Sequence, residues 1–279
     1  YSGPATTRLT NEDCAENGFH WMFDTYSSAS GAAAALTRGG DKTWYFLTVD
    51  YAFGHSLEKD AGDVVKAYGG QVLGNVRHPL NASDFSSFIL QAKNSGAQVI
   101  GLANGAQDTV NAIKAAREFG VGGKQKVASL LMFLTDVHSL GLRQAQGLMF
   151  SEGFYWDMDD QTRALSTRFE KLHKGYKPTM VQAGVYSSTL HYLLTVATAK
   201  TDDWKVVAKK MRALPIKDPV MRNASIRDDG RVIHDMYLFE VKKPAESKAP
   251  WDYYKTVSTI PAQIAFKPLE SSSCPLVKK

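Results

Sequence analysis

The residues best suited to chemistry in this 279-residue sequence are spread along the chain and form no recognisable catalytic cluster. Its seven histidines have no histidine partner at i,i+4 spacing and no H-E-x-x-H pattern, so they do not predict a metal site. Asp157, Asp159 and Asp160 resemble a pair of catalytic carboxylates, but they precede a predicted helix, whose dipole favours acidic residues in its first turn. No nucleophile elbow, phosphate-binding loop or dinucleotide-binding glycine pattern occurs in the sequence. The sequence therefore predicts neither an enzyme nor a bound cofactor or metal.

Polar and aromatic residues follow three of the predicted strands at the point where each strand ends. In open α/β sheets, ligands bind outside the carboxyl ends of parallel strands, because loops and helix N-termini there offer N–H groups and side chains. A mixture of polar and aromatic residues suits a small amphipathic ligand. These residues are Tyr51 and Phe53 after the first strand, Asn104 and Gly105 after the third, and Thr135 and Asp136 after the fourth.

Two interpretations of these residues stay open. A carboxylate at Asp136, directly after an apolar run, would be only partly solvated and would suit a ligand ammonium or hydroxyl, but it would equally suit the start of a helix. Tyr51 and Phe53 would serve equally well as ligand contacts or as packing at the edge of the sheet.

The elements that position these residues alternate between strand and helix. Residues 43–49 form a continuous β-branched and aromatic run, which predicts a strand buried on both faces. Repeated strand–helix–strand order with short turns predicts a parallel sheet covered by helices. The predicted strands are 43–49, 72–76, 98–103 and 127–134, separated by helices around 57–68, 83–92 (with Ser83 as N-cap) and 110–116.

The second half of the chain has a different pattern. Helical spacing of apolar residues predicts three helices, around 165–172, 186–197 and 207–214. From about residue 225 the pattern changes to strands, with Asp229-Gly230 as a hairpin turn. The tail from Pro244 is rich in Pro, Ser and Lys, and its aromatic residues predict a docked strand or extended arm.

Composition narrows the classes further. The sequence is 44% hydrophobic and 22% charged, which is close to the globular average and excludes a disordered tail protein. No apolar run approaches the ~18–20 residues that a membrane-spanning helix needs. The net charge of +5 is dispersed, so nucleic-acid binding is not favoured. The opening residues lack the basic and apolar segments of a signal peptide, so a secreted protein would have to be present here in mature or trimmed form.

The two cysteines, Cys14 and Cys274, lie far apart in the sequence, which excludes a zinc or redox spacing. They are either two free thiols or one long-range disulfide. The polar, loop-like setting of each favours the disulfide, which persists in oxidising compartments.

Several motifs, spread over essentially the whole chain, resemble the substrate-binding proteins of branched-chain amino acid ABC transporters, the type I periplasmic binding proteins. The resemblance implies an α/β fold with two Rossmann-like lobes joined by three hinge crossovers, near residues 23–25, 150–155 and 214–219. The motifs are Ser-Gly-Pro-Ala-Thr-Thr-Arg-Leu-Thr at 2–10, Asp-Tyr-Ala-Phe-Gly at 50–54, Asp-Phe-Ser at 84–86, the helix at 110–120, Gly-Leu-Met-Phe at 147–150 and Gln-Ala-Gly-Val-Tyr at 182–186.

The implied lobes are discontinuous in sequence. Lobe 1 would take residues 1–24 and 156–216, and lobe 2 would take residues 25–155 and 217–279. Members of the family begin with strand–helix units of lobe 1 ahead of the Gly-Pro-Ala-Thr segment, so the resemblance implies that lobe 1 is incomplete here, and we expect a truncated chain. The ligand would bind in the interlobe cleft and favour hinge closure.

The resemblance also assigns roles to individual residues. Ala5 and Thr6 match the loop that holds the ligand carboxylate, and Asp136 lies near the position that pairs with its amino group. Phe53 replaces a tyrosine of the cleft, Gln182 lies at an aromatic wall, and Asn104 and Gly105 match the rim of lobe 2. Independently of the family, we expect Trp156 to stack on the ligand or else to pack at the hinge.

The implied function is that of a periplasmic solute-binding component of an ABC importer in a Gram-negative bacterium. Its ligand would be a small carboxylate, either an amino acid or an aromatic acid, its partner a membrane ABC permease, and its state a monomer. In this setting Cys14 and Cys274 should pair. The alternative is an extracellular ligand-sensing receptor or amide-sensor module of the same fold, and an α/β enzyme is disfavoured because no catalytic motif is found.

Overall fold

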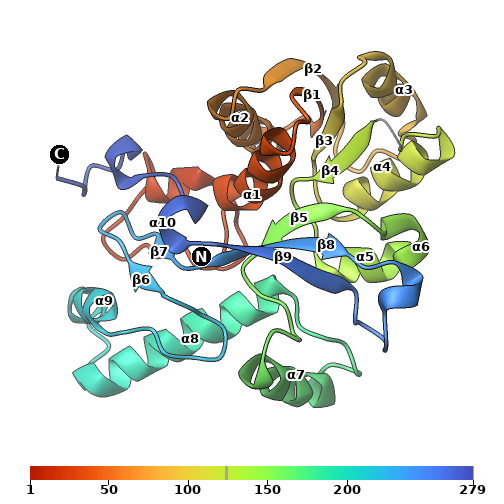
Figure 1. Ribbon diagram of the computed structural model, residues 1–279. Helices are drawn as coiled ribbons and strands as arrows, with labels where there is room; N and C mark the ends of the chain where they lie inside the picture. The colour runs from red at the N-terminus through yellow and green to blue at the C-terminus, as the bar shows by residue number, and fades with distance from the viewer. Residues whose placement is uncertain (123–124, 279) are drawn as a thin grey trace. The chain divides into compact units, whose positions relative to one another are not determined.

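The computed structural model describes residues 1–122 and 125–278, and the chain divides into two compact units (Figure 1). The chain passes between the units after residues 24, 151, 236 and 258. Unit 1 comprises Tyr1–Asp24, Glu152–Met236 and Thr259–Lys279, and unit 2 comprises Thr25–Ser151 and Tyr237–Ser258.

These units differ from the expected lobes over residues 152–155, 217–236 and 259–279, which belong to unit 1. The two longer segments are tied to the N-terminal residues. Arg231 pairs with His20 in an isolated parallel bridge, and Cys274 forms a disulfide with Cys14. The expected disulfide is thus confirmed.

Unit 2 is built on a parallel sheet with the strand order β2-β1-β3-β4. The central strands are almost entirely buried, as expected for a parallel sheet covered on both faces. The predicted strand at 43–49 is confirmed, whereas the strand predicted at 127–134 ends at Ser129. The strands are β1 (Thr43–Val49), β2 (Gln71–His78), β3 (Val99–Ala103) and β4 (Lys126–Ser129).

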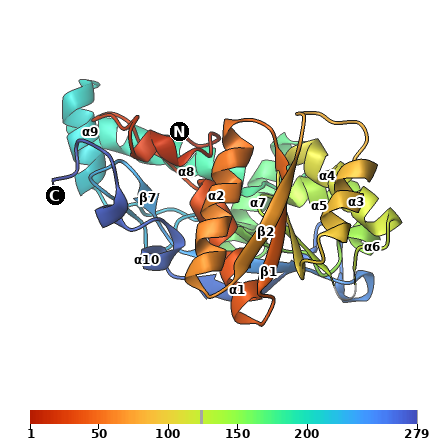
Figure 2. The same cartoon turned by 90° about the horizontal axis from the view of Figure 1, so that it is seen from above.

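Helices cover both faces of this sheet. The pair α1 (Thr25–Arg38) and α2 (Ala52–Ala67) packs together, as does the pair α3 (Ser86–Asn94) and α4 (Ala106–Glu118). Figure 2 shows the two pairs on opposite faces. After β4 the chain continues into α5 (Leu134–Leu140) and α6 (Leu142–Ala145).

Two local expectations for unit 2 are corrected. Leu134 begins α5 and does not end a strand, because the apolar run 130–134 leaves the sheet after β4. Ser83 is not the N-cap of α3, since that helix begins at Ser86 and the carboxylate of Asp84 accepts the Ser86 N–H at 2.8 Å.

A second sheet has the strand order β5-β8-β9. Its strands are β5 (Met149–Glu152), β8 (Met236–Val241) and β9 (Tyr254–Ile260), and the short helix η2 (Pro244–Glu246) lies between the last two. Most residues of each strand belong to unit 2 and the rest to unit 1, so these strands carry the chain from one unit to the other. β9 confirms that the tail contains a docked strand.

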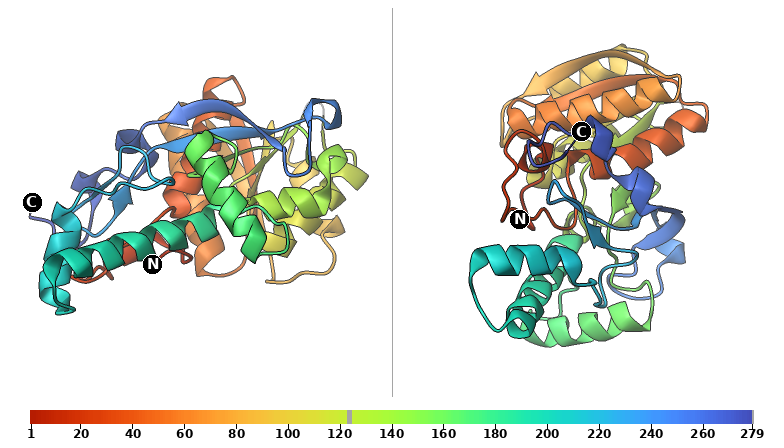
Figure 3. Two further views of the ribbon diagram at one scale, coloured as in Figure 1. Left: turned by 90° about the horizontal axis from the view of Figure 1, so that it is seen from below. Right: turned by 90° about the vertical axis from the view of Figure 1, so that its left-hand side faces the viewer.

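Unit 1 is mainly helical in its described residues. The three predicted helices are confirmed, and Figure 3 shows α8 as the long helix of this unit, with α9 against one end. Its elements are η1 (Thr7–Thr10), α7 (Asp160–Leu172), α8 (Met180–Ala199), α9 (Trp204–Ala213), β6 (Ser225–Ile226), β7 (Val232–Ile233), α10 (Ala262–Ala265) and η3 (Leu269–Ser271).

The interior of unit 1 holds a buried cation. Arg231 is 0% exposed, lies 3.5 Å from the Asp24 carboxylate and stacks on the Phe266 ring at 4.2 Å. Burial lowers the pKa of Arg231 to about 10. Burial likewise lowers the pKa of His20 to about 3 and that of His234 to about 4, so both imidazoles are neutral near pH 7. The N-terminal segment is therefore held by one buried charge pair and neutral histidines.

Candidate functional site

The strand order of unit 2 creates a topological switch point between β1 and β3. The chain leaves β1 to build β2 on one side and then returns to build β3 on the other side. Loops from adjacent strands therefore diverge at this point, and the carboxyl edge of such a sheet is where α/β proteins bind ligands. Tyr51 and Phe53 follow β1, and Asn104 and Gly105 follow β3, so four predicted residues flank the switch point.

An aromatic pair stands at the end of β1. Tyr51 precedes the first residue of α2, is 43% exposed, and its ring centroid lies 5.8 Å from that of Phe53. Partial burial and the nearby Asp108 carboxylate raise the pKa of the Tyr51 phenol. The pair thus offers an aromatic surface with a neutral hydroxyl.

Gly105 brings the ends of β1, β3 and β4 together. A Cβ atom at this position would lie 3.4 Å from Leu131 Cδ2 and 3.8 Å from Phe53 Cε1. Leu131, just after β4, is buried and packs beneath this edge, whereas the sequence predicts it inside a strand. The signal that marks it is the apolar run that continues past the sheet.

Asn104 serves the framework of this edge. Its side chain is 0% exposed, donates to Nε2 of His78 at 3.1 Å and accepts from the Thr109 hydroxyl at 2.7 Å. Nδ1 of His78 lies 2.9 Å from the Pro79 carbonyl, so this nitrogen carries the proton, and burial lowers the pKa of the ring. The Asn104 amide is thus engaged within the protein, and the residue stabilises the loop from which Gly105 projects.

The backbone after Gly105 is strained. Ala106 is exposed and has φ of 51°, a left-handed value that residues other than glycine and asparagine rarely adopt. It opens α4, whose N-cap, Gly105, makes no side-chain capping hydrogen bond. Backbone strain of this kind concentrates at ligand clamps and other functional sites.

Asp136 occupies the third position of α5. It is half-buried, and its carboxylate accepts the backbone N–H of Phe133 at 2.9 Å. Burial raises the pKa of Asp136 to about 6, and the hydrogen bond from Phe133 opposes that rise. The helix-terminal interpretation of Asp136 is therefore the one seen in the structure, and a role toward ligand ammonium stays a prediction. Its neighbour Thr135 is exposed.

The predicted carboxylate-binding residues lie in unit 1. Ala5 and Thr6 are half-buried, and the Thr6 hydroxyl accepts the Arg8 N–H at 3.4 Å where η1 begins. Nε2 of His20 lies 2.8 Å from the carbonyl oxygen of Pro4, the residue before Ala5. The loop is therefore anchored on both sides of Ala5 and Thr6.

Two further predicted residues of unit 1 have structural partners. Gln182 caps α8, because its side-chain oxygen accepts the Thr179 N–H at 2.9 Å. The Lys177 ammonium lies 3.9 Å from the centroid of the Trp156 ring, so a cation already stacks on that ring. Both residues therefore have structural roles, and their contact with ligand stays a prediction.

Within residues 1–122 and 125–278, no group of three or more acidic, histidine or cysteine side chains is arranged to hold a metal ion. In the same residues, no helix is both long and apolar enough to cross a membrane. The unit 2 edge offers the Tyr51–Phe53 aromatic pair, the first turn of α4 after Gly105, and the half-buried carboxylate of Asp136.

Comparisons with known proteins agree on one fold. A family model described as periplasmic binding protein matches residues 1–248. A periplasmic binding protein from Burkholderia mallei shares 50% identity and a TM-score of 0.95, covering 98% of this chain and 72% of its own. A branched chain amino acid ABC transporter periplasmic ligand-binding protein from Burkholderia xenovorans LB400 shares 38% identity and a TM-score of 0.90, covering 99% and 74%.

A more distant solved structure with the same fold holds an aromatic acid. It is an ABC transporter solute binding protein from R. palustris in complex with 4-hydroxybenzoate, with 21% identity, a TM-score of 0.83, and coverage of 96% of this chain and 73% of its own. A search of curated proteins returned no match.

Proposed function

Because the chain belongs to the periplasmic binding protein family, among the type I proteins of branched-chain amino acid ABC transporters, we propose that it is the solute-binding component of an ABC importer for a small carboxylate. The observation that carries this proposal is the carboxyl edge of the unit 2 sheet. There Tyr51, Phe53, Gly105 and Leu131 lie at the ends of neighbouring strands on both sides of the switch point.

The first candidate ligand is an amino acid with an apolar side chain. Its ammonium would pair with Asp136, which is ionised above pH about 6. Its side chain would pack on the aromatic pair and on Leu131. The relative from Burkholderia xenovorans is described as a ligand-binding protein of a branched chain amino acid ABC transporter.

The second candidate is an aromatic acid. The Tyr51–Phe53 pair favours it, because an offset aromatic arrangement accepts another ring. An aromatic acid without an ammonium makes no ion pair with Asp136, and an ionised Asp136 would repel it. The R. palustris protein is described with 4-hydroxybenzoate.

The carboxylate itself would be held by the anchored loop of unit 1. Ala5 would offer its backbone N–H, and Thr6 its hydroxyl. Trp156 and Gln182 of the same unit would contact the ligand only if Lys177 or the α8 cap gave way. We therefore expect substitutions at Thr6 to weaken binding more than substitutions at Gln182.

Isothermal titration with L-leucine and with benzoate, each at pH 5 and pH 7.5, separates the candidates. Ionisation of Asp136 around pH 6 should strengthen leucine binding about tenfold from pH 5 to 7.5. Benzoate should show the opposite trend. If the protein bound neither of these compounds and no other amino or aromatic acid, that result would contradict the proposed function.

Variants locate the site. Asp136→Asn should abolish the rise of leucine affinity with pH, and Phe53→Ala should weaken either ligand. Asp63→Asn is the matched control, because Asp63 is exposed on α2 and pairs with Lys59. Equal losses from Asp136→Asn and Asp63→Asn would place the ligand elsewhere.

The alternative function, ligand sensing by a receptor module, predicts binding of the same solute with a different partner. For the solute-binding component, in contrast, we propose a membrane ABC permease as the partner, a periplasmic location and a monomeric chain. Stimulation of a reconstituted permease ATPase by the loaded protein is the expected result. Ligand binding with no effect on any cognate permease would favour the sensory module.

A further inference from the structure

Helix α5 is short for an element that carries a candidate ligand residue. It has 7 residues and packs against α4 and α6. An isolated helix shorter than about 12 residues is marginal in water, so the position of α5 depends on contacts outside the helix. Its buried side is apolar and consists of Leu134, Val137 and Leu140. Its exposed side carries His138, which contacts a distant part of the chain.

The partner of His138 is the loop between β8 and β9, residues 242–253. The imidazole stacks on the Trp251 indole, with ring centroids 4.0 Å apart and ring planes 10° apart. Nδ1 of His138 also lies 2.8 Å from the hydroxyl oxygen of Tyr253. The rings of Trp251 and Tyr253 lie 5.9 Å apart. The three side chains therefore form one aromatic cluster, here called the α5 clamp.

The loop side of the α5 clamp is held in place by further contacts. Trp251 is 7% exposed, and the neighbouring Asp252 is buried as well. The Asp252 carboxylate pairs with the Lys242 ammonium and accepts the Lys248 N–H at 2.9 Å. The Lys242 N–H donates to the Tyr253 carbonyl at 2.7 Å. Helix α5 is thus attached to a loop that has its own internal bonds.

The backbone of Trp251 is strained. Its φ is 71°, in the left-handed region that a bulky residue rarely adopts. Strain of this kind persists only where the surrounding structure holds it, and it concentrates at functional sites. Here the stack on His138 and the bonds of Asp252 and Tyr253 hold it. The loop therefore keeps an unfavourable conformation in which Trp251 contacts α5.

Asp136 lies two residues before His138 in the same helix. Its carboxylate is half-buried and accepts the Phe133 N–H at 2.9 Å. Burial raises the pKa of Asp136 to about 6, so the titration of this carboxyl reports how closely α5 packs on its surroundings. The charged residues of the helices packed against α5 are Asp108, Lys114, Arg117 and Glu118 on α4 and Arg143 on α6.

We infer that His138, Trp251 and Tyr253 are positioning residues, which hold α5 against the β8–β9 loop and thereby keep the Asp136 carboxylate at the edge of the unit 2 sheet. The role of that carboxylate toward a ligand ammonium rests on the proposed function, whereas its dependence on the α5 clamp does not. Amino acids should therefore need an intact clamp more than aromatic acids without an ammonium do.

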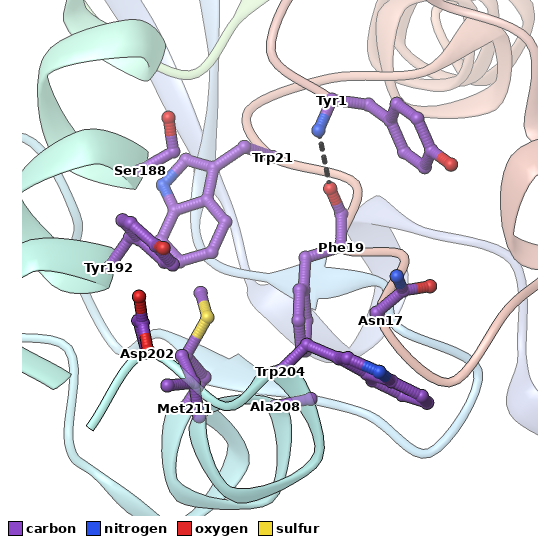
Figure 4. A pocket seen from close by; sticks show the side chains of 11 residues that line it. Tyr1, Asn17, Phe19, Trp21, Ser188, Tyr192, Asp202, Trp204, Ala208 and Met211 are labelled. Atoms are coloured by element: carbon purple, nitrogen blue, oxygen red, sulfur yellow. Dashed lines mark hydrogen bonds between the residues drawn. The ribbon is translucent and has the colours of Figure 1, made fainter. Parts of the chain in front are cut away.

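A second tryptophan–histidine pair, in unit 1, supplies a control. Trp21 is among the residues that line a pocket of about 390 Å³ (Figure 4). Its ring centroid lies 5.6 Å from that of His191, with the planes tilted by 42°, and its indole donates to the Ser187 hydroxyl at 2.9 Å. Both rings are buried. Loss of this pair should destabilise unit 1 without changing the titration of Asp136.

Carbon-13 NMR of the Asp136 carboxyl in the protein without solute tests the inference. The parent should titrate near pH 6. His138→Ala should lower the midpoint by about one pH unit, because a loosened α5 exposes the carboxylate to water. His138→Phe keeps a ring against Trp251 and should restore most of the parent value. His173→Ala, which removes an exposed histidine beside an aromatic ring of unit 1, should leave the midpoint unchanged.

Trp251→Leu and Trp21→Leu separate positioning from a general loss of stability. Both remove a buried indole that contacts a histidine, so thermal unfolding should show both variants to be less stable. Only Trp251→Leu should lower the Asp136 midpoint, and it should weaken L-leucine binding at pH 7.5 about tenfold while benzoate binding changes little. Circular dichroism checks that the variants stay folded.

Two kinds of outcome are distinguishable. An Asp136 midpoint near 3.8 in the parent, a midpoint unmoved by His138→Ala and Trp251→Leu, or one moved equally by Trp21→Leu would overturn the inference. A lowered midpoint in both clamp variants of a protein that binds no amino or aromatic acid would support the positioning of Asp136 and contradict the proposed function.

Discussion

Helix α2 of unit 2 and helix α8 of unit 1 are both long, at 16 and 20 residues, but they distribute charge differently. α2 turns Lys59, Asp63 and Lys66 to solvent and buries Leu57, Ala61 and Val65 against the sheet. α8 has no Asp, Glu, Lys or Arg on either side. The difference teaches that α2 covers its solvent side with charged residues, whereas α8 exposes large apolar side chains such as Leu193 and Leu194.

The two units also differ in what holds them together. Unit 2 relies on parallel strands buried between helix pairs. Unit 1 joins three separate chain segments through point contacts, among them the Cys14–Cys274 disulfide and the Arg231–Asp24 ion pair. The following predictions test whether single links matter more in unit 1 than in unit 2.

The largest effect is expected at Arg231. Replacing it with Met removes a fully buried cation and leaves the Asp24 carboxylate without that partner. We expect Arg231→Met to lower the free energy of unfolding by about 3 to 5 kcal/mol. Urea unfolding measures the loss, and faster hydrogen exchange should appear at β7 before β1. The double variant Arg231→Met/Asp24→Asn should recover part of the loss, and no recovery would show that the charge pair is not the cause.

Reduction of the disulfide is expected to have the next largest effect. Cys14 and Cys274 are 260 positions apart, so the bond restricts the unfolded chain over nearly its whole length. The variant Cys14→Ser/Cys274→Ser should lose about 2 to 4 kcal/mol of stability, with faster exchange confined to unit 1. An unchanged thermal midpoint after reduction would show that the disulfide does not stabilise unit 1.

A smaller effect, with a sign set by pH, is expected at Asp136 in unit 2. Burial raises the pKa of this carboxyl in the folded state to about 6, above the ordinary value of 3.8. The folded protein therefore binds this proton more tightly than the unfolded chain does. The contribution of this protonation to the free energy of unfolding is complete below pH about 4 and is lost as the pH rises through about 6.

Asp136→Asn removes that dependence. The free energy of unfolding of the variant should match that of the parent near pH 4 and exceed it by about 1 kcal/mol at pH 7.5. This figure allows for the favourable interaction with the helix N-terminus that the variant loses. Thermal unfolding across this pH range is the measurement. A parent whose stability rises between pH 4 and 7 while the variant stays flat would contradict the sign.

The smallest effect is expected at Ala106. Glycine accepts the φ of 51° without steric cost, so Ala106→Gly should raise stability by about 0.5 kcal/mol despite its greater chain entropy. If the strain also orients the first turn of α4 toward ligand, solute affinity should fall at the same time. A loss of stability would show that the left-handed conformation carries no strain.

Much of unit 2 could be predicted because its strands are continuous apolar runs. Residues 43–49 match β1 at both ends. α1 was not predicted, because its small residues are buried on nearly all sides and show no 3.6-residue hydrophobic pattern. The strand predicted at 127–134 is too long, because an apolar run looks the same in a strand and in a loop that leads to a helix.

The candidate site was predictable as a sheet edge but not in its side-chain detail. The positions of Tyr51, Phe53 and Gly105 follow from strand ends alone. The engagement of Asn104 by His78 depends on a partner from a different strand, which no local pattern reveals. The same is true of unit 1, where residues 217–236 are held by contacts to the N-terminal segment.

The interleaved path of the chain sets how far each contact reaches along the sequence. All strands of the parallel sheet lie within residues 43–129, so this sheet pairs across short connections. β5 reaches β8 only across residues 153–235. The N-terminal segment has the longest reach, since Cys14 and Cys274 are 260 positions apart. Contacts between distant residues cost more loop-closure entropy and form more slowly, so we expect the parallel sheet of unit 2 to fold first and unit 1 to close last.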